Sequence, residues 1–284
     1  MPYEVDLATA QALFPEYKII QALTPSEQKA AFHVEDAEGV PFCLKLIAPT
    51  YSPDRLDREI SALQSLSHPN VVGLVEYTYS TRQGTRRHYI IEEFVEGEDL
   101  QSVLVPGAPW PLARACTFFS LLSDGLQALK NADLVHRDLK PTNIRVRPDG
   151  SPVIVDFGLV RHLSLPDLTR TDEGAAIGTP VYFAPEQFTG TKRDIDHRTD
   201  LFALGILLYQ ALVGSHPFMQ DGMSYGDLRE AVCHSSDFTL QEGFKNLDTS
   251  PRLLLGRLLE KERAKRPQSA AQVATMLRRI GVDQ

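Results

Sequence analysis

The sequence predicts an α+β fold made of two lobes, a small β-rich one and a larger α-helical one. Strand-like segments dominate up to about residue 95, and helical periodicity takes over from residue 96 onward. The chain has 284 residues, enough for two lobes that share a cleft, and its 43% hydrophobic and 23% charged residues are typical of a soluble globular protein. We therefore expect a strand-rich lobe over residues 1–95 and a helical lobe over residues 96–284, with the chemistry in the cleft between them.

The first lobe should begin with a short extension, residues 1–16, in which 7–14 forms a helix that caps the lobe. Apolar residues three or four positions apart, followed by a His-Pro-Asn stop, predict an amphipathic helix over 53–66. Apolar runs bounded by Gly, Pro or polar residues predict strands, with a polar loop over 80–87 before the last of them. The expected strands are 17–23, 32–34, 40–47, 71–79 and 88–95.

The second lobe should be built mainly from helices, with short strand-like pieces and a long polar loop between the first two. The most apolar segment, 201–213, is too short to span a bilayer and includes Gln210, so we expect a buried helix there. The main expected helices are 112–132, 201–213, 251–260 and 269–280.

Charge and cysteine content exclude several classes of function. The formal net charge of −8 gives no general attraction to nucleic acid or to anionic lipid. The three cysteines are scattered, so neither a zinc site nor a disulfide framework is expected. The N-terminus lacks the basic start and apolar run of a signal peptide. These features favour a cytoplasmic protein with reduced thiols and no membrane span, and its oligomeric state is not written in the sequence.

Two short motifs combine the residue types needed for magnesium-dependent phosphoryl transfer. The octapeptide HRDLKPTN ends at Asn143, and the triplet DFG begins at Asp156 after an apolar run. Mg²⁺ takes oxygen ligands, so Asn143 and Asp156 can hold it against the phosphates of ATP. Asp138 can then orient and deprotonate an attacking hydroxyl, while Lys140 neutralises charge on the transferred group. Each motif alone is usually an ordinary turn, but both in this order and spacing are hard to obtain by chance.

With these motifs the sequence resembles the protein kinase superfamily over nearly its whole length, from about residue 17 to residue 280. The resemblance implies a bilobal fold, with a five-stranded sheet and one helix in the N-lobe and ATP bound at the hinge. It also implies that Lys45, in the strand motif FCLK, contacts the α- and β-phosphates. Glu59 would be its ion-pair partner on the first helix of the lobe. Taken singly, Lys45 and Glu59 would pass for surface residues.

The resemblance assigns further nucleotide contacts in the N-lobe. Leu23 begins the segment that aligns with the family's nucleotide-binding loop, and Ala31 falls at the position over the adenine. Glu93 and Val95 lie in the expected hinge, and Asp156 completes the predicted cofactor-binding set.

Features of the second lobe resemble those of serine/threonine kinases. Lys140 lies two residues after Asp138, and the sequence GTP precedes APE near residue 186, which is the serine/threonine pattern. Glu186 of that motif resembles the partner of a buried arginine, here Arg266. Asp200 resembles the aspartate that braces the catalytic loop, so these last three residues are expected to be structural.

The segment between Gly158 and Gly178 is the expected activation segment. It contains Thr169 and Thr171, and an arginine precedes Asp138, as in kinases in which a phosphorylated residue of this segment docks on that arginine. The sequence therefore predicts autophosphorylation at Thr169 or Thr171.

The glycine-rich loop of the family is degenerate here. Thr24, Ser26 and Lys29 stand where the three glycines should be, with Pro25 between the first two. Glycines at these positions let backbone amides approach the phosphates closely. Two interpretations follow: side chains replace some amide contacts in an enzyme that binds nucleotide more weakly, or the chain is a pseudokinase that acts as an ATP-binding or scaffolding module. The retained catalytic residues favour the first.

The hinge contains a second departure. Glu92 stands where families have a bulky group behind the adenine, and a buried carboxylate is costly unless it is paired or protonated. Lys45 is the obvious partner, and this pairing would compete with Glu59 and favour an inactive arrangement. The alternative is a local shift in strand register that points Glu92 elsewhere.

Other functions fit the sequence less well. A small-molecule phosphotransferase of the aminoglycoside or choline type shares the fold, but it lacks the segment ending in APE that serves protein substrates. Receptor-type bacterial kinases carry a membrane helix beyond the catalytic domain, whereas this chain ends just after the last kinase-like helix. We expect either a free-standing kinase or an excised domain, acting on protein Ser/Thr hydroxyls with ATP and Mg²⁺.

Overall fold

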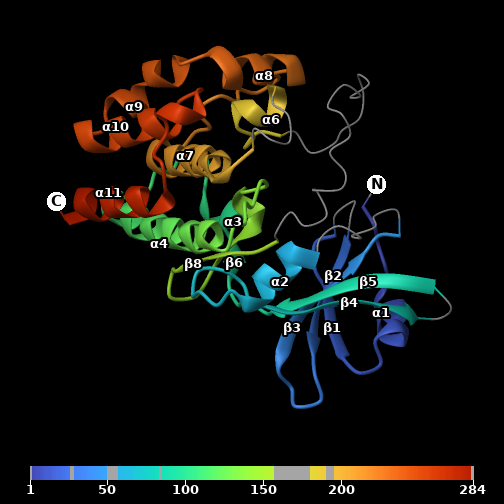
Figure 1. Ribbon diagram of the computed structural model, residues 1–284. Helices are drawn as coiled ribbons and strands as arrows, with labels where there is room; N and C mark the ends of the chain where they lie inside the picture. The colour runs from blue at the N-terminus through green and yellow to red at the C-terminus, as the bar shows by residue number, and fades with distance from the viewer. Residues whose placement is uncertain are drawn as a thin grey trace. The chain divides into compact units, whose positions relative to one another are not determined.

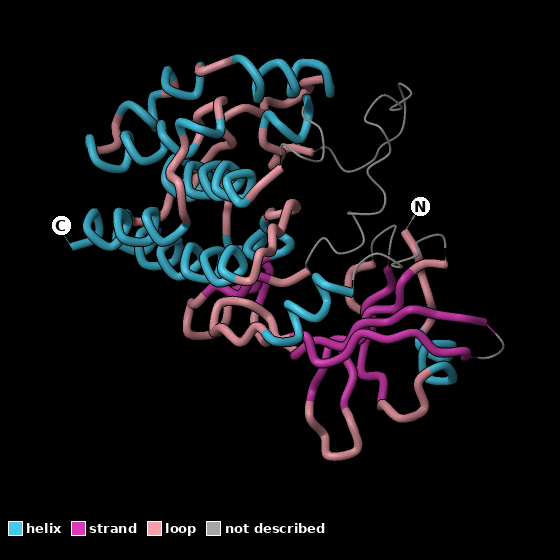
Figure 2. Tube along the Cα trace, in the orientation of Figure 1, coloured by secondary structure: helices cyan, strands magenta, loops and turns pink. Residues whose placement is uncertain are grey.

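The structure is a computed structural model of the chain (Figure 1). It describes residues 2–25, 29–49, 57–82, 85–156, 180–189 and 195–282, and of residues 57–59, 80, 82, 85 and 86 it describes the backbone alone. The described residues form two compact units, one ending at Val95 and the other beginning at Glu96. Strands gather in the first unit and helices in the second (Figure 2). The predicted α+β fold, with a β-sheet lobe and a helical lobe, is confirmed.

The first unit is built on an antiparallel sheet with the strand order β1-β2-β3-β5-β4. Successive side chains along the central strands point to opposite faces of the sheet, and each face buries one set of them. Its strands are β1 (Lys18–Ala22), β2 (Lys29–Glu35), β3 (Pro41–Ile47), β4 (Leu74–Arg82) and β5 (Thr85–Glu93).

The hairpin of β4 and β5 is longer than the sequence indicated. The polar loop expected over 80–87 is wrong, because β4 continues to Arg82 and β5 starts at Thr85. The pairs Ser80↔Arg87 and Arg82↔Thr85 extend the ladder. Polar residues are compatible with a strand wherever the ladder supplies backbone hydrogen bonds, so polarity alone does not end it.

The N-terminal helix α1 (Leu7–Leu13) packs on one face of this sheet. Leu13 and Phe14 are almost fully buried there, and Phe14 meets Tyr89 of β5 edge to face, with ring centroids 5.1 Å apart. Gln11 fixes the helix to the residues that follow it, by donating to Tyr17 O and accepting from Ile19 N. The extension is therefore part of the hydrophobic core of the first unit.

The opposite face of the sheet carries the polar residues relevant to function. Residues directly opposite each other in a ladder point to the same face. Lys45 pairs with Ala31 on one side and Ile90 on the other, and Cys43 pairs with Glu92. The helix α2 (Asp57–Ser65) buries Ile60 and Leu63 and contacts β4.

The second unit is organised around the helix α7 (His197–Val213), most of whose residues are buried on all sides. It packs against α4 (Leu112–Asn131) and α10 (Thr249–Leu258), and α4 in turn packs along α11 (Ala270–Val282) (Figure 1). Gly205 permits the contact with α10, because a Cβ there would lie 2.8 Å from Leu258 Cβ. The sequence placed these four helices correctly, and α7 starts four residues earlier than expected, at an N-cap formed by Asp196.

Shorter elements complete the unit. A three-stranded sheet is formed by β6 (Glu98–Asp99), β7 (Ile144–Val146) and β8 (Pro152–Ile154). The others are α3 (Leu100–Val103), η1 (Pro141–Asn143), α6 (Pro185–Thr189), α8 (Tyr225–His234), η4 (Asp237–Leu240), α9 (Glu242–Lys245) and η5 (Arg263–Lys265). Among the residues that the structure describes, no helix is long and apolar enough to cross a membrane.

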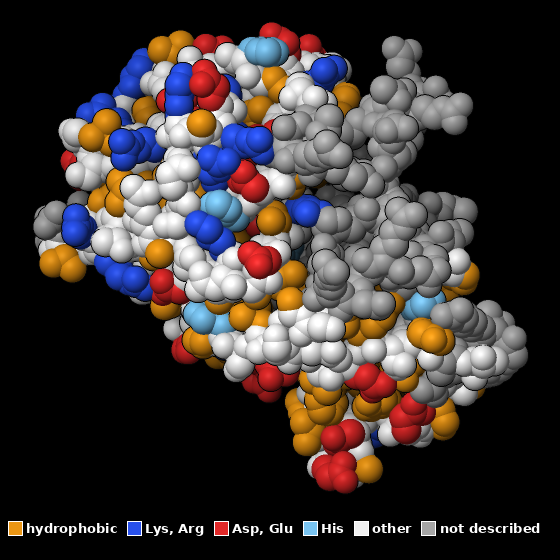
Figure 3. All heavy atoms as spheres, viewed as in Figure 1, with side chains coloured by type: hydrophobic (Ala, Val, Ile, Leu, Met, Phe, Trp, Pro, Cys, Tyr) orange, Lys and Arg blue, Asp and Glu red, His pale blue; other side chains and the backbone are white. Residues whose placement is uncertain are grey.

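Charged side chains on the helical unit are mixed in sign. In Figure 3, Lys and Arg lie among Asp and Glu on the visible face of this unit. Interspersed charges are typical of a solvated surface.

Candidate functional site

The octapeptide 136–143 forms a loop whose backbone is held from within the second unit. Arg137 adopts a left-handed conformation with φ of 63°, which is strained for a residue with a side chain. The two carboxylate oxygens of Asp200 accept hydrogen bonds from His136 N and Arg137 N, both at 2.8 Å. Burial raises the pKa of Asp200, and the two N–H donors oppose that shift. Asp200 therefore braces the loop, in the role expected for it.

Asp138 follows directly and gathers the other predicted catalytic side chains around it. Lys140 Nζ lies 3.0 Å from Asp138 Oδ2, in a partly exposed pair. Asn143 Nδ2 donates to Asp138 O at 2.8 Å and to its carboxylate at 3.2 Å. The three predicted catalytic residues thus lie within one hydrogen-bonded group, with the carboxylate of Asp138 at its centre.

The two predicted metal ligands lie at one end of the β7–β8 hairpin. Val155 N donates to Asn143 O at 3.0 Å, and Asp156 is the next residue along the chain. His136 ties the catalytic loop to the same point, with Nε2 3.1 Å from Val155 O. Because Asp138 N donates to His136 Nδ1, the ring proton belongs on Nε2 and the imidazole donates to that carbonyl.

The donor atoms at this end suit Mg²⁺. Since the Nδ2 group of Asn143 donates to Asp138, its Oδ1 is the atom left to coordinate a cation, and Asp156 adds carboxylate oxygens. Across the described residues, no group of three or more His, Cys, Asp or Glu side chains could hold a metal ion by itself. A site with two protein ligands fits Mg²⁺, which keeps waters and uses substrate phosphates for its remaining positions.

The helix α6, which begins at the proline of the APE motif, is anchored by a buried ion pair. Arg266 NH1 and NH2 donate to the two carboxylate oxygens of Glu186 at 2.7 and 2.8 Å. Thr199 Oγ1 donates to the same carboxylate at 2.8 Å. Arg266 also donates to three backbone carbonyls, so it holds α6, α7 and the segment before η5 together.

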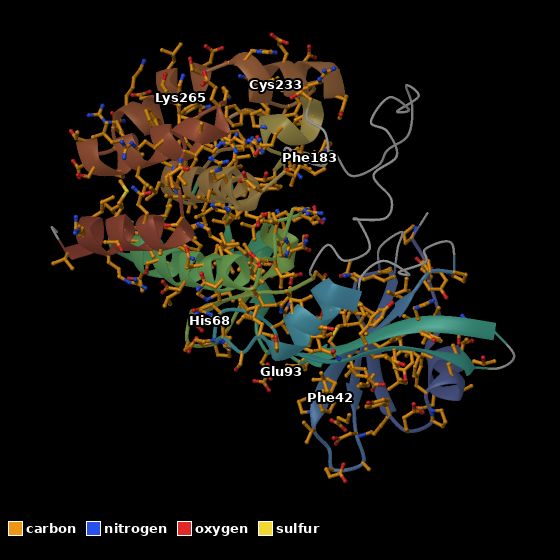
Figure 4. The ribbon with its side chains drawn as sticks, viewed as in Figure 1. Phe42, His68, Glu93, Phe183, Cys233 and Lys265 are labelled. Carbon is orange, nitrogen blue, oxygen red and sulfur yellow. The ribbon has the colours of Figure 1, made fainter. Side chains whose placement is uncertain are left out.

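The segment just before α6 is held by a histidine. His216 Nδ1 accepts from Phe218 N and Met219 N, so Nε2 carries the proton and donates to Val181 O at 2.9 Å. Burial lowers the pKa of His216 to about 4, and the ring is therefore neutral at physiological pH. Phe183, labelled in Figure 4, packs edge to face on Phe188 of α6 with ring centroids 5.7 Å apart.

In the first unit, Lys45 is paired with Glu92. Lys45 Nζ makes an ion pair with Glu92 Oε2, and both side chains are about 5% exposed. The pair runs diagonally across β3 and β5, since Cys43 is the residue directly opposite Glu92. The pairing interpretation of Glu92 is confirmed, and the alternative, a register shift pointing it elsewhere, is wrong.

The other predicted nucleotide contacts belong to the first unit as well. Leu23 N donates to Ala31 O at 2.8 Å, which places Leu23 at the end of β1 beside the strand of Ala31. Glu93, labelled in Figure 4, ends β5, where its N–H donates to Gly73 O, and Val95 follows after one residue. Glu59 lies in α2, but its side chain is outside the described part of the structure.

Several predicted features fall on residues that the structure does not describe. One of them is Ser26 of the degenerate glycine-rich loop. The others are Phe157, Gly158, the segment with Thr169 and Thr171, and Gly178 with Thr179. The other residues of the degenerate glycine-rich loop named above are described: Thr24 is exposed, Pro25 is half-buried and Lys29 begins β2.

Comparison with known proteins identifies the family. The sequence matches the family "Protein kinase domain" over residues 31–277, which is most of the chain. The chain belongs to this family. The kinase domain includes every predicted site residue except Leu23, which precedes the matched range.

Proteins similar to this chain include bacterial serine/threonine kinases. The kinase pkn2 of Myxococcus xanthus is 36% identical over 79% of this chain and 27% of that protein. The DNA damage-responsive kinase RqkA of Deinococcus radiodurans is 32% identical over 94% of this chain and 40% of that protein. PknD of Mycobacterium tuberculosis is 31% identical over 74% of this chain and 31% of that protein. The match spans well under half the length of each relative, and the predicted serine/threonine-type kinase domain is confirmed.

Sequence reasoning missed two residues that organise this kinase domain. His216 holds Val181, and Gln187 of α6 links Ala184 to the backbone of the catalytic loop. Neither has a chemical type or spacing that stands out in the sequence. His216 precedes a Pro-Phe pair and Gln187 follows the APE motif, so closeness to these motifs was the available signal.

Proposed function

We propose that this domain is an active serine/threonine kinase that transfers the γ-phosphate of ATP to protein hydroxyls. The observation that carries the proposal is the group around Asp138, in which Lys140 and Asn143 contact one carboxylate at the end of a braced loop. Such a group presents a positioned carboxylate that can accept a proton from a hydroxyl. Retention of the whole group is unexpected in a domain that has lost catalysis.

Each residue has a role in this proposal. Asp138 orients the attacking hydroxyl and accepts its proton, and Lys140 moves from Asp138 toward the transferred phosphoryl group as negative charge develops there. Asn143 and Asp156 would hold Mg²⁺, which would supply positive charge to neutralise the phosphates. Lys45 holds the α- and β-phosphates, with Leu23, Ala31, Glu93 and Val95 around the adenine.

The cofactors, the phosphorylated residues and the location are inferred from the chemistry of phosphoryl transfer and of the side chains. ATP and Mg²⁺ are the expected cofactors, and autophosphorylation is expected at Thr169 or Thr171. A cytoplasmic location is supported by three cysteines that are not joined in disulfides and by the need for ATP as phosphate donor.

A second candidate is a pseudokinase that binds nucleotide or partners without turnover. The Lys45–Glu92 pair favours it, because a lysine held by a buried carboxylate is not available to phosphates. The missing glycines act in the same direction, since side chains keep backbone amides away from phosphates.

Phosphate transfer from labelled ATP with Mg²⁺ separates the two candidates. The full chain is assayed alone and with a generic basic protein, beside Asp138→Asn, which removes the proton acceptor but keeps the shape. Label on serine or threonine that disappears in Asp138→Asn establishes the kinase, and mass spectrometry then locates the phosphorylated residues. ATP binding without transfer would instead establish the pseudokinase.

A further inference from the structure

The side-chain amide of Gln187 bridges two functional segments of the second unit. Gln187 lies in α6 and is 8% exposed. Its Oε1 accepts from Ala184 N at 2.9 Å, and its Nε2 donates to Arg137 O, also at 2.9 Å. Ala184 ends the segment that precedes α6, and Arg137 immediately precedes Asp138. We call residues 180–184 the substrate-binding segment, because the segment ending in APE serves protein substrates in this family. One side chain thus contacts both this segment and the catalytic loop.

The orientation of this amide is fixed by its two partners. Ala184 N can only donate and Arg137 O can only accept, so exchanging the oxygen and nitrogen of Gln187 would oppose donor to donor and acceptor to acceptor. Because the site is buried, losing either bond leaves a polar backbone group without water to replace it. A glutamine is therefore specified here by chemistry as well as by size.

The Arg137 carbonyl is a sensitive point in the catalytic loop. Arg137 has φ of 63°, a conformation that persists only where the surroundings hold it. Asp200 fixes the N–H side of this residue, and Gln187 fixes the carbonyl side. That carbonyl belongs to the peptide bond between Arg137 and Asp138, so its direction sets the position of the Asp138 Cα, from which the catalytic side chain extends.

The geometry points to Gln187 as a positioning residue that couples the substrate-binding segment to Asp138. The segment is itself anchored on both sides of Ala184, by His216 at Val181 and by Arg266 at Glu186. A displacement of this segment is therefore passed through a rigid amide to the backbone of the catalytic loop. Gln187 contacts neither nucleotide nor the transferred group, and it acts through Arg137 alone.

Two substitutions in the full chain test this coupling, and the test rests on the proposed kinase activity. Gln187→Glu keeps the shape and the acceptor for Ala184 N, but when ionised it places an oxygen against Arg137 O. Gln187→Met removes both bonds. We expect kcat to fall about 10- to 100-fold in each, as for a displacement of order 1 Å, with the ATP KM within about twofold. Relative to the wild type, the kcat of Gln187→Glu should recover as the pH falls from about 8.5 to 6, because a protonated carboxyl again donates to Arg137 O. The kcat of Gln187→Met should show no such recovery.

Tyr209→Phe is the matched control. It removes a buried hydrogen bond elsewhere in the same unit, from Tyr209 Oη to Phe238 O, and leaves the bonds of α6 and of the catalytic loop in place. We expect it to lower the melting temperature about as much as Gln187→Met while leaving kcat unchanged. An equal loss of kcat in Tyr209→Phe would overturn the proposal, because the loss of any buried hydrogen bond in this unit would then suffice.

Hydrogen exchange of the catalytic-loop amides provides a readout that needs no activity. Peptides covering residues 134–140 should exchange faster in both Gln187 variants than in the wild type or in Tyr209→Phe. Unchanged exchange, or wild-type kcat in Gln187→Met, would refute the coupling. If the wild type itself transfers no phosphate, the proposed function fails, and the exchange rates still decide whether Gln187 holds the loop.

Discussion

Each of the two units buries an ion pair, and the two pairs differ in how firmly they are held. In the helical unit, Arg266 is fully buried and binds Glu186 through two nitrogens, while its remaining donors bind backbone carbonyls. In the strand unit, the ammonium of Lys45 meets the carboxylate of Glu92 on one face of the sheet. A guanidinium held in a fork has a single geometry, whereas an ammonium on a flexible stem can change partners.

The difference separates a structural pair from one that can be exchanged. Breaking the Arg266–Glu186 pair removes the link between α6 and the rest of the helical unit, so its cost should appear in stability. Breaking the Lys45–Glu92 pair removes a buried carboxylate that holds the ammonium, so its effect should appear in nucleotide binding. Substitutions at the two pairs, each with a matched control, can break or sharpen this contrast, and one at His216 tests a neighbouring anchor of the helical unit.

Arg266→Met should have the largest effect. It leaves the Glu186 carboxylate buried without its counter-ion, which typically costs about 3–5 kcal/mol. We expect a strongly lowered midpoint of urea unfolding. The double variant Glu186→Met with Arg266→Met should recover part of the loss, because no charge is then left buried.

Arg278→Met is the surface control for this substitution. Arg278 pairs with Asp124, but its side chain is 52% exposed, and such pairs contribute about 1 kcal/mol or less. If Arg266→Met unfolded at nearly the same urea concentration as Arg278→Met, the first pair would not be the anchor that its geometry indicates.

The His216 anchor should make stability depend on pH. Burial lowers the pKa of His216 from 6.5 to about 4, so the unfolded chain binds a proton in a range where the folded chain does not. The stabilisation is fully present above pH 6.5 and is lost as the pH falls from 6.5 toward 4. From this pKa difference the stabilisation amounts to about 3 kcal/mol, reduced by the partial exposure of the residue.

His216→Gln isolates this contribution, because an amide can donate to Val181 O but does not titrate in this range. The difference in melting temperature between the wild type and His216→Gln should shrink or reverse as the pH is lowered from 7 to 5. A difference that stays constant over this range would mean that the buried histidine is not a source of acid sensitivity.

Local sequence was a good guide where a motif fixes its own surroundings. The contacts among Asp138, Lys140 and Asn143 involve residues within five positions of one another, so a short loop already keeps them near one another along the chain. Asp200 and the Arg266–Glu186 pair were also expected, but only from the family resemblance, because their partners are distant in the sequence.

The contacts that sequence reasoning missed depend on tertiary packing. Gln187 meets Arg137 fifty positions away, and His216 meets Val181 thirty-five positions away. A single glutamine or histidine in a sequence is not part of a periodic or charge pattern that would predict a buried backbone partner. The extension of the β4–β5 hairpin was missed for a similar reason, since ladder hydrogen bonds form between backbones whatever the polarity of the side chains.

Glu92→Gln should have the smallest effect on the fold and the most informative effect on function. The amide keeps the size of Glu92 but removes the charge that pairs with Lys45, so the phosphates of a nucleotide no longer compete with that carboxylate for the ammonium. We expect ATP to bind about tenfold more tightly in calorimetric titrations, a gain of roughly 1.4 kcal/mol, while the melting temperature without nucleotide falls. Glu35→Gln is the control, because it makes the same charge change on β2 of the same sheet, in an exposed pair with Lys18.

The opposite result would change the meaning of the pair. If Glu92→Gln bound ATP more weakly while Glu35→Gln did not, Glu92 would be the residue that orients Lys45 for the phosphates, in place of the helix partner Glu59. The contrast between the two ion pairs would then disappear, because both would be fixed structural supports. Repeating the titration with ADP, AMP and adenosine would locate the effect, since contact of Lys45 with the α- and β-phosphates requires a change that grows from AMP to ADP and is absent for adenosine.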